Sequence, residues 1–138
     1  MMRAMPQMRI REAAAYLGVS DDTVRRWIDN GVLEAEVGES GRKVVDGYEV
    51  AQVARKHAAP PPLPGGLVSS ARNRFVGIVT DIQTDAVMAQ VELQCGPFRV
   101  VSLMSSEAVR DLRLELGSVA VAAIKSTNVI VETAEGDA

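Results

Sequence analysis

A run of prolines and glycines, AAPPPLPGG at residues 58–66, constrains the fold of this 138-residue chain more than any other feature. Proline has a fixed φ and no backbone N–H, so this run favours extended polyproline II over a helix or a central strand. Apolar residues recur with helical spacing before the run and alternate with the strand period after it. We therefore predict two small domains joined by a linker, although a surface loop within one domain would have the same local pattern.

The predicted boundaries divide the chain into four segments. Residues 1–57 form an N-terminal domain, residues 58–68 the linker, residues 69–133 a second domain, and residues 134–138 a tail. This plan fits the length, because 138 residues make one ordinary domain or two very small ones. Aromatic residues are only 4% of the chain, so each core must be built mainly from Val, Leu, Ile and Ala.

One cysteine, Cys95, and one histidine, His57, narrow the possible chemistry. A single cysteine forms no internal disulfide and suits a reducing cytoplasm. With so few His and Cys residues we expect neither a zinc site nor a Ser–His–acid nucleophile, and hence no enzyme and no metal cation cofactor. The sequence has no uninterrupted apolar stretch typical of a signal peptide or a membrane span, so we expect a cytoplasmic protein.

Two short helices are predicted in RIREAAAYLGVSDDTVRRWIDNGVL, residues 9–33. Ala13 and Ala14 lie on the inner face of the first helix, and Gly18 ends it. Ser20 is placed as the N-cap of the second helix. Two short helices joined by a glycine-containing turn form a helix-turn-helix, whose second helix presents side chains to a DNA major groove.

The second of these helices has two different faces. Val24 and Trp27 recur with helical spacing and are expected to pack on the first helix. Thr23, Arg25 and Arg26 fall largely on the other side. Taken alone, the two arginines would be an ordinary solvated helix face, and only their place in the two-helix frame favours DNA contact. A helix-turn-helix can also serve purely for protein interaction.

A hairpin and a third helix are predicted next. In LEAEVGESGRKVV, residues 33–45, two short strand-like runs flank the sequence GESG. Arg42 and Lys43 follow the hairpin tip and are placed to meet a phosphate backbone. The third helix, within DGYEVAQVARKH, has Asp46 as its N-cap and Val50, Val53 and Ala54 on its expected inner face. Two helices, a hairpin wing and a third helix make a winged helix-turn-helix.

Alternating apolar and polar residues predict strands in the second half, in RFVGIVTDI, AVMAQVELQ, FRVVSL, SVAVAAI and residues 129–132. A short helix capped by Ser105 or Ser106, with Val109 and Leu112 inside, lies between the third and fourth strands. Five strands and one helix describe a small OB-like β-barrel. The predicted fold class is therefore α+β, a winged helix-turn-helix followed by a small barrel.

Polar side chains gather where the strands of the second half begin and end. They are hydrogen-bond donors or carry positive charge, which together with the free N–H groups of a helix N-terminus suits an oxyanion. The members are Ser70, Arg72, Asn73, Ser105, Ser106, Lys125, Ser126 and Thr127. Other interpretations stay open: Lys125 as a surface lysine, Ser105 as a cap only, and Arg72 as the partner of an acid such as Asp81.

The stretch IREAAAYLGVSDDTVRRWIDNGVL, within residues 9–57, resembles the winged helix-turn-helix of the MerR and excisionase families. This resemblance implies sequence-specific binding of double-stranded DNA through the second helix and the wing. The residues it implies for the helix are Ser20, Thr23, Arg25 and Arg26, and those for the wing are Arg42 and Lys43.

The blocks SARNRFVGIVTDI, MSSEAVRDLRLELG and VAVAAIKSTNVIVE look like the Mop module, also called the molybdenum-pterin-binding or TOBE module. The resemblance implies that molybdate or tungstate binds between subunits, at sites lined by hydroxyls, backbone amides and a lysine. By position, the implied ligands are Ser70, Arg72, Ser105, Lys125 and Ser126; some members have a serine where this chain has Ala108. A single copy cannot enclose the ligand, so the resemblance implies a homo-oligomer, from a dimer to a hexamer.

The sequence therefore predicts a molybdate-binding transcriptional regulator that acts on molybdate-related genes. One alternative is a molybdate storage or buffering oligomer whose helix-turn-helix serves assembly. Another is a barrel that binds nucleic acid strands, but Phe75 and Phe98 are the only aromatic residues of that half, too few for a stacking platform.

Overall fold

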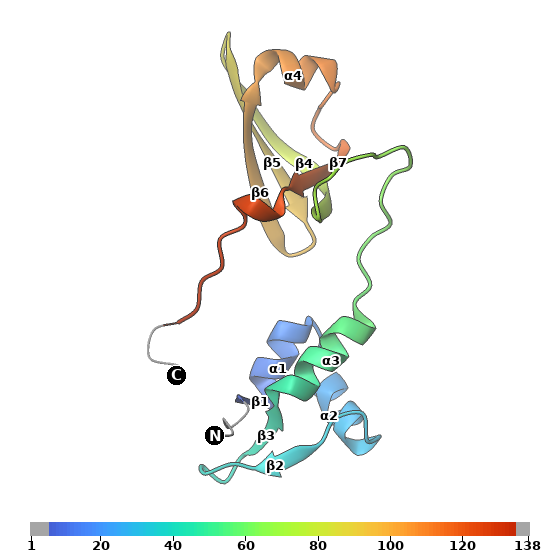
Figure 1. Ribbon diagram of the computed structural model, residues 1–138, viewed down its shortest axis with the longest axis vertical. Helices are drawn as coiled ribbons and strands as arrows, with labels where there is room; N and C mark the ends of the chain where they lie inside the picture. Colours follow the sequence, from blue (N-terminus) through green and yellow to red (C-terminus); the bar gives the residue numbers. More distant parts are fainter. Residues whose placement is uncertain (1–5, 135–138) are drawn as a thin grey trace. The chain divides into compact units, whose positions relative to one another are not determined.

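The structure is a computed structural model that describes residues 6–134. It falls into two compact units that divide between Pro60 and Pro61 (Figure 1). Residues 1–5 of the expected first domain, and all of the expected tail except residue 134, lie outside the described residues.

The first unit combines three helices with a three-stranded sheet. Its elements in chain order are β1 (Gln7–Arg9), α1 (Ile10–Leu17), α2 (Asp21–Asp29), β2 (Ala35–Val37), β3 (Lys43–Asp46) and α3 (Gly47–His57). The antiparallel sheet has the order β1-β3-β2, so β2 and β3 form the expected hairpin. Small and branched residues fill the core, which includes Ala13, Val24, Leu33 and Val45.

Local signals at the helix ends behave as the sequence predicts. Gly18 ends α1 with a φ of 70°, a left-handed conformation that glycine adopts without steric cost. The Ser20 side chain accepts a hydrogen bond from the Thr23 N–H and begins α2 as its N-cap. Asp46 caps α3 in the same way through the Glu49 N–H. The Gly18 and Ser20 caps fix the turn between α1 and α2 that makes the helix-turn-helix.

Two features of the first unit differ from the expectation. The strand β1 was not predicted, because its sequence Gln-Met-Arg has no run of alternating apolar residues; it forms by pairing with β3. Ala54 was predicted on the inner face of α3, but it is exposed, while Val50 and Val53 are buried. The core needs only the two valines of α3, and the small alanine lies beyond its edge.

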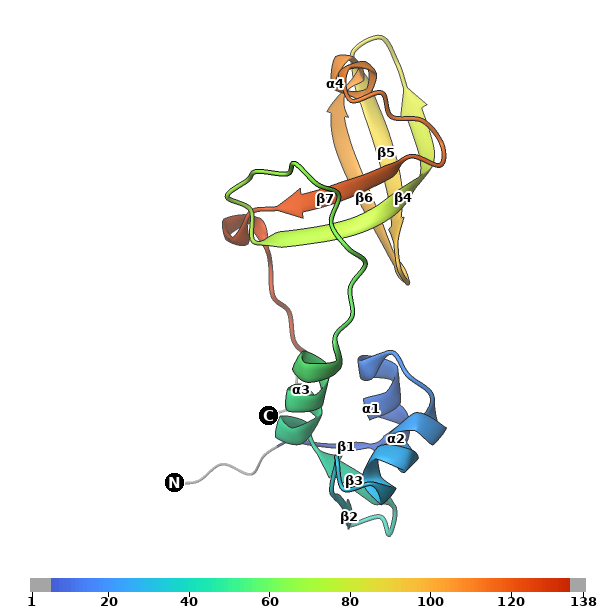
Figure 2. The ribbon, with the colours of Figure 1, turned by 90° about the vertical axis from the view of Figure 1, so that its right-hand side faces the viewer.

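The second unit is a curled antiparallel sheet with one short helix. Its elements are β4 (Asn73–Thr84), β5 (Met88–Cys95), β6 (Phe98–Ser105), α4 (Ser106–Asp111), β7 (Val119–Ile124) and the 3₁₀ helix η1 (Ser126–Asn128). The strand order is β6-β5-β4-β7, so β6 and β7 are the edges of the sheet. Figure 2 shows the curl of the sheet, with α4 and η1 at different ends of it. Its buried residues include Val79, Ala89, Val91 and Leu93.

The predicted α+β class with a small OB-like barrel is confirmed as a curled antiparallel half-barrel (Figure 2), but the sheet has four strands where five were predicted. Residues 129–132 were predicted as a fifth strand, but they have no regular structure. Alternation gives a segment strand propensity, yet a strand forms only where an edge supplies hydrogen-bond partners. Leu112 was expected inside and is 64% exposed, because α4 ends at Asp111 and buries only Val109 of the two.

Candidate functional site

The predicted DNA-contacting residues on and beside α2 differ in their exposure and in their hydrogen-bond partners. The Ser20 Oγ lies 3.0 Å from the Thr23 Oγ1, so the two hydroxyls form a hydrogen bond, and the Ser20 Oγ also accepts the capping bond from the Thr23 N–H. Arg25 and Arg26 are exposed. The Arg25 guanidinium lies 3.3 Å from the Asp22 carboxylate, and both side chains are largely exposed. Such a surface pair is weak, so Arg25 can exchange its carboxylate partner for a phosphate.

The wing brings a second cation to α2. A hollow of about 120 Å³ is lined by Arg25, Ile28 and Asp29 of α2, by Lys43 of β3, and by Ile10 at the start of α1. The fold therefore places Arg25 and Lys43, 18 positions apart in the chain, on one hollow beside the N-terminus of a helix. Guanidinium, ammonium and helix N-terminus all favour an anion such as a phosphate group.

Not every predicted DNA contact lies on this hollow. Arg42 is exposed in the turn between β2 and β3, and Arg26 is exposed on α2, but neither lines it. The carboxylate of Asp29 does line the hollow, and Glu36 and Glu39 are exposed on the wing. The sequence did not single out Ile10 or Asp29, because their part in the hollow depends on how α1, α2 and β3 pack.

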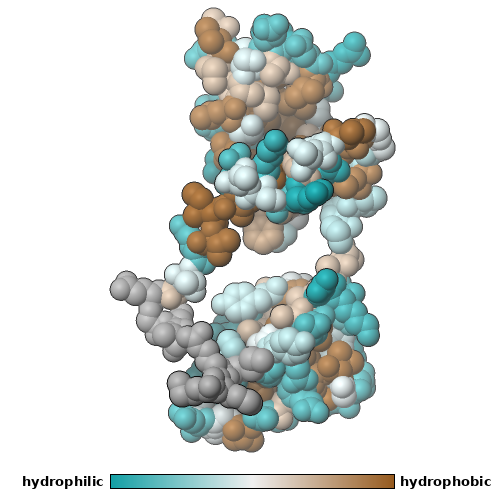
Figure 3. All heavy atoms as spheres, in the orientation of Figure 1, coloured by the Kyte–Doolittle hydropathy of each residue, from teal (hydrophilic) through white to brown (hydrophobic). Residues whose placement is uncertain are grey.

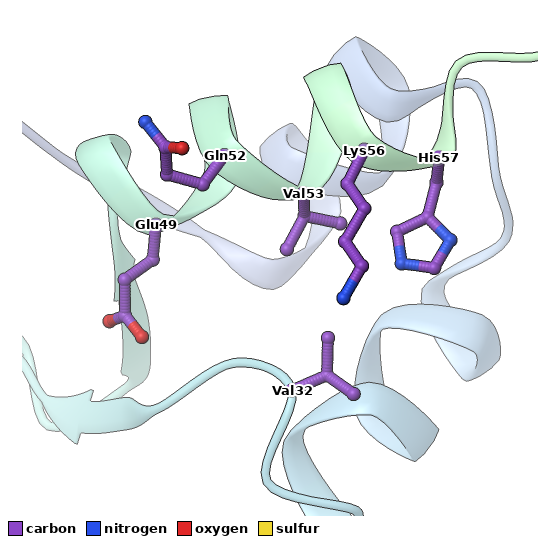
Figure 4. A pocket seen from close by; sticks show the side chains of 6 residues that line it. All are labelled: Val32, Glu49, Gln52, Val53, Lys56 and His57. Carbon is purple, nitrogen blue, oxygen red and sulfur yellow. The ribbon is translucent and has the colours of Figure 1, made fainter.

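A second hollow in the first unit, of about 320 Å³, lies between α3 and the turn after α2 (Figure 4). Its lining is Val32, Glu49, Gln52, Val53, Lys56 and His57. Next to it, the rings of His57 and Trp27 stack with their centroids 5.2 Å apart. This stack joins the last residue of α3 to α2, so the hollow is a by-product of the packing that orients α2.

Six predicted oxyanion ligands lie on two chain segments that the sheet brings to one end of the second unit. The register pairs Asn73 with Ile124, so residues 70–73 come beside residues 125–127. The Asn73 side chain donates to the Ile124 carbonyl over 3.2 Å and ties the two segments together. We call this group the lysine cluster: Ser70, Arg72, Asn73, Lys125, Ser126 and Thr127. No Asp or Glu occurs in residues 69–74 or 124–128, so the cluster supplies donors and positive charge.

The other two predicted ligands, Ser105 and Ser106, form a separate group, the serine cluster, at the start of α4. The Ser105 Oγ accepts a hydrogen bond from the Ala108 N–H over 3.0 Å and caps the helix. Ser106 is 3% exposed, and its hydroxyl donates to the Asp85 carbonyl over 2.8 Å. Ser106 is thus held in a structural contact between α4 and the β4–β5 turn, and Ser105 is the exposed hydroxyl.

Within one chain the two clusters lie apart. The lysine cluster is beside Asn73, the first residue of β4, whereas Ser105 pairs with Met88, just beyond Thr84 at the other end of that strand. At about 3.3 Å per residue, the 12 residues of β4 extend over roughly 36 Å along the strand. The structure therefore does not bring all eight predicted ligands together.

The turn that holds the serine cluster is fixed by a carboxylate. Asp85 accepts hydrogen bonds from the backbone N–H groups of Met88 and Val87, each over 2.8 Å. These bonds lower the pKa of Asp85, with the Met88 N–H as the larger cause. Elsewhere, burial raises the pKa of the Cys95 thiol, which lies against the Phe75 carbonyl. An uncharged, enclosed thiol of this kind packs as a small apolar group.

Two broader features bear on the chemistry. Among residues 6–134, no three His, Cys, Asp or Glu side chains gather closely enough to hold a metal ion. In the same part of the chain, no helix is both long and apolar enough to cross a membrane.

Comparisons with known proteins agree with this division. A helix-turn-helix domain model matches residues 8–57, and a TOBE domain model matches residues 69–131. The molybdenum transport protein ModE of Herbaspirillum seropedicae is 39% identical over 66 residues, which are 47% of this chain and 24% of that protein. The chain thus spans about a quarter of the length of this relative.

Two shorter relationships concern the second unit. A protein of Haemophilus influenzae described as a probable molybdenum-pterin-binding protein is 43% identical over 63 residues, which are 45% of this chain and 91% of that protein. The solved structure of the cytoplasmic molybdate-binding protein ModG has 42% identity and a TM-score of 0.45, with 47% of each chain covered. The names of these relatives describe proteins that bind or transport molybdenum compounds.

Proposed function

This chain belongs to the TOBE domain family through residues 69–131 and carries a helix-turn-helix domain at residues 8–57, and from this we propose that it is a molybdate-responsive, DNA-binding transcriptional regulator. The observation that carries the proposal is the pairing of two sites in one chain. The first unit has the Arg25–Lys43 hollow, and the second has the lysine cluster.

The lysine cluster suits a tetrahedral dianion. Lys125 and Arg72 supply positive charge, and the hydroxyls of Ser70, Ser126 and Thr127 supply donors. Charge-assisted hydrogen bonds of this kind offset the cost of removing an oxyanion from water. Molybdate and tungstate have the same charge, tetrahedral shape and nearly the same size, so the cluster accepts either, whereas the smaller sulfate dianion should reach fewer of the donors, and no metal cation has a part in this binding.

The distance between the two clusters supports a homo-oligomeric site. A bound oxyanion is too small to touch the lysine cluster and Ser105 of the same chain, because β4 separates them. A second copy, turned so that its Ser105 lies against the first copy's Lys125, would complete the donor set. The domain boundaries predicted from sequence, residues 1–57 and 69–133, fit a plan in which the second domain assembles and the first reads DNA.

The first unit supports DNA binding through its hollow. In our proposal α2 enters the major groove with Arg26 and Thr23, while Arg25 and Lys43 hold one backbone phosphate. Ser20 caps α2, and Arg42 reaches a neighbouring phosphate from the wing. The Asp29, Glu36 and Glu39 carboxylates oppose binding, so we expect modest affinity for each unit and a need for two units on one operator.

These same carboxylates favour one other function. An acidic wing suits a storage or buffering oligomer whose helix-turn-helix contacts protein rather than DNA. That function requires molybdate binding without any salt-dependent binding to duplex DNA, whereas a DNA-binding protein loses affinity steeply as salt rises.

Two measurements on the full chain test the regulator. Isothermal titration with molybdate, with sulfate as the control anion, should show molybdate binding at a fixed ratio per oligomer and little heat from sulfate. Duplexes selected from a random-sequence pool should then be bound with an affinity that differs with and without saturating molybdate at one salt concentration. A ligand changes DNA affinity only by its differential affinity for the two states, so identical affinities would exclude the switch.

A further inference from the structure

The segment that leads into β4 carries a proposed oxyanion donor, Ser70, on exposed and irregular backbone. Residues 60–70 are all exposed, and residues 67–72 lie outside the helices and strands. Gly65 and Gly66 precede the segment, and glycine gives the backbone high conformational freedom. A donor on such a segment binds an anion well only if the segment is ordered beforehand, because the entropy of ordering it otherwise reduces the affinity.

Two hydrogen bonds within residues 69–74 order this segment. The guanidinium of Arg74, the second residue of β4, donates to the Ser69 carbonyl over 3.2 Å. The Ser69 Oγ accepts from the Ala71 N–H over 3.0 Å, which closes a tight turn around Ser70. Arg74 is itself anchored in the sheet, because it pairs with Ala123 of β7. The turn that carries Ser70 is therefore tied to the regular part of the second unit.

The bond from Arg74 also orients the peptide group between Ser69 and Ser70. Residues 6–134 contain no cis peptide bond, so the N–H of this peptide, which belongs to Ser70, points opposite to the carbonyl that Arg74 holds. Within the described part of the chain, the Ser70 N–H donates to no acceptor. It is therefore an oriented backbone donor beside the Ser70 hydroxyl.

The guanidinium of Arg74 has no carboxylate that competes for it. The two ion pairs among residues 6–134 do not include Arg74, and residues 69–74 contain no Asp or Glu. An acid beside Arg74 would draw the guanidinium away from the Ser69 carbonyl, because a carboxylate is the stronger acceptor. Figure 3 shows hydrophilic side chains gathered on the second unit around η1, the end of the sheet where the lysine cluster lies.

We propose that Arg74 is a positioning residue for oxyanion binding. Successive residues of a strand face opposite sides, so Arg74 lies on the face of β4 opposite to Asn73 of the lysine cluster. It acts without touching the anion, by holding the Ser69 carbonyl so that Ser70 presents its two donors before the anion binds. The inference rests on the proposed function, because it takes the lysine cluster as the molybdate site.

The test is Arg74→Met in the full chain, with molybdate affinity measured by isothermal titration at about 0.05 M and about 0.5 M salt. Methionine keeps the unbranched stem and removes both the donor and the charge. We expect the affinity to fall about 10-fold at both salt concentrations, because the lost charge-assisted hydrogen bond is partly exposed. Arg74→Lys keeps a charged donor and should restore part of the affinity. The matched control is Arg110→Met on the exposed side of α4, which should bind like the wild type.

Two further measurements separate positioning from a purely structural role. The melting temperature of Arg74→Met should stay close to that of the wild type. NMR relaxation of the Ser70 and Ala71 amides in the ligand-free protein should show more motion than in the wild type. If Arg74→Met unfolds, Ser69→Ala, which removes the other bond of the turn at an exposed residue, must still weaken molybdate binding.

Three outcomes overturn the inference: an Arg74→Met variant that binds molybdate as tightly as the wild type, a loss that disappears at high salt, or unchanged motion of the Ser70 amide. A loss confined to low salt indicates a distant effect of charge, which salt screens. A wild type that fails to bind molybdate contradicts the proposed function instead. The amide relaxation, which needs no ligand, then decides whether Arg74 orders the turn.

Discussion

Gly77, in the middle of β4, is a position where one added methyl group should be costly. A Cβ placed there would lie 2.5 Å from the Cys95 Sγ and 2.7 Å from the Gln94 carbonyl oxygen, both closer than such atoms normally come. The Gln94 oxygen belongs to the backbone of β5, and the Cys95 side chain is buried. Neither neighbour can rotate away, so Gly77→Ala must push β5 away from β4.

The magnitude follows from two opposing effects. Overpacking a close-packed interior costs about 1–3 kcal/mol. Alanine also restricts the unfolded chain, which stabilises the fold by about 0.4–1 kcal/mol. The difference lies between about 0 and 2.6 kcal/mol, and because both contacts are shorter than 3.0 Å and one is to backbone, we expect about 2 kcal/mol of destabilisation, or roughly 8–16 °C in the melting temperature of a domain of this size. Because β4 joins the two clusters, this destabilisation would also disturb oxyanion binding.

Scanning calorimetry of the full chain measures the effect. The matched control is Gly65→Ala in the linker, where an added Cβ meets nothing within 4 Å; it should change stability by no more than about 0.5 kcal/mol. Adding Cys95→Ala to Gly77→Ala removes one of the two clashing neighbours and should restore part of the stability. An unchanged melting transition in Gly77→Ala would refute the strand spacing on which this reasoning depends.

Three further predictions concern the sites. Lys125→Ala should weaken molybdate binding about 10- to 100-fold in calorimetric titration, because it removes a charge-assisted hydrogen bond; the exposed Arg110→Ala on α4 should not, and equal effects would place the anion elsewhere. Lys43→Gln should reduce the slope of log affinity for DNA against log salt by about 0.9 for each phosphate that the protein no longer neutralises, whereas Arg55→Gln at the exposed end of α3 leaves it unchanged. Asp85 has a lowered pKa in the folded state, so its stabilising effect is present above its ordinary pKa of 3.8 and is lost as pH falls toward the folded value. Asp85→Ala should thus melt at a lower temperature near neutral pH and converge with the wild type in acid, and a constant difference at all pH values would contradict this assignment.

Features set by neighbouring residues could be predicted from the sequence. Gly18 and Ser20 act within one turn of their own position, and the structure has the turn and cap that they indicate. The alternation likewise placed Ala89, Val91 and Leu93 on the buried face of β5, whereas Val87, which belongs to the same alternating pattern, precedes the strand and is 69% exposed. The fifth strand failed because strand formation depends on a free edge, and in one copy residues 129–132 do not pair with one.

The same distinction, between features set by neighbouring residues and features set by distant pairing, applies to the candidate sites. The residue types of the lysine and serine clusters were visible in the sequence, but their separation follows from the register of β4, β5 and β6. The structural bond of Ser106 joins residues 21 positions apart, which no local pattern indicates. The meeting of Arg25 and Lys43 also depends on how the wing packs against α2. The predicted contacts with DNA and oxyanion stay predictions.

The stack of Trp27 on His57 also has a spectroscopic consequence. Trp27 is the only tryptophan of the chain, and the two tyrosines, Tyr16 and Tyr48, occur in the same unit. All of the chain's strong intrinsic fluorescence therefore arises from the helix-turn-helix, while the half-barrel contains only phenylalanine. Trp27 lies on α2 itself, so a change in its emission when an oxyanion is added to the unlabelled protein would be a direct optical signal that the helix proposed to read DNA has responded to an event in the other unit.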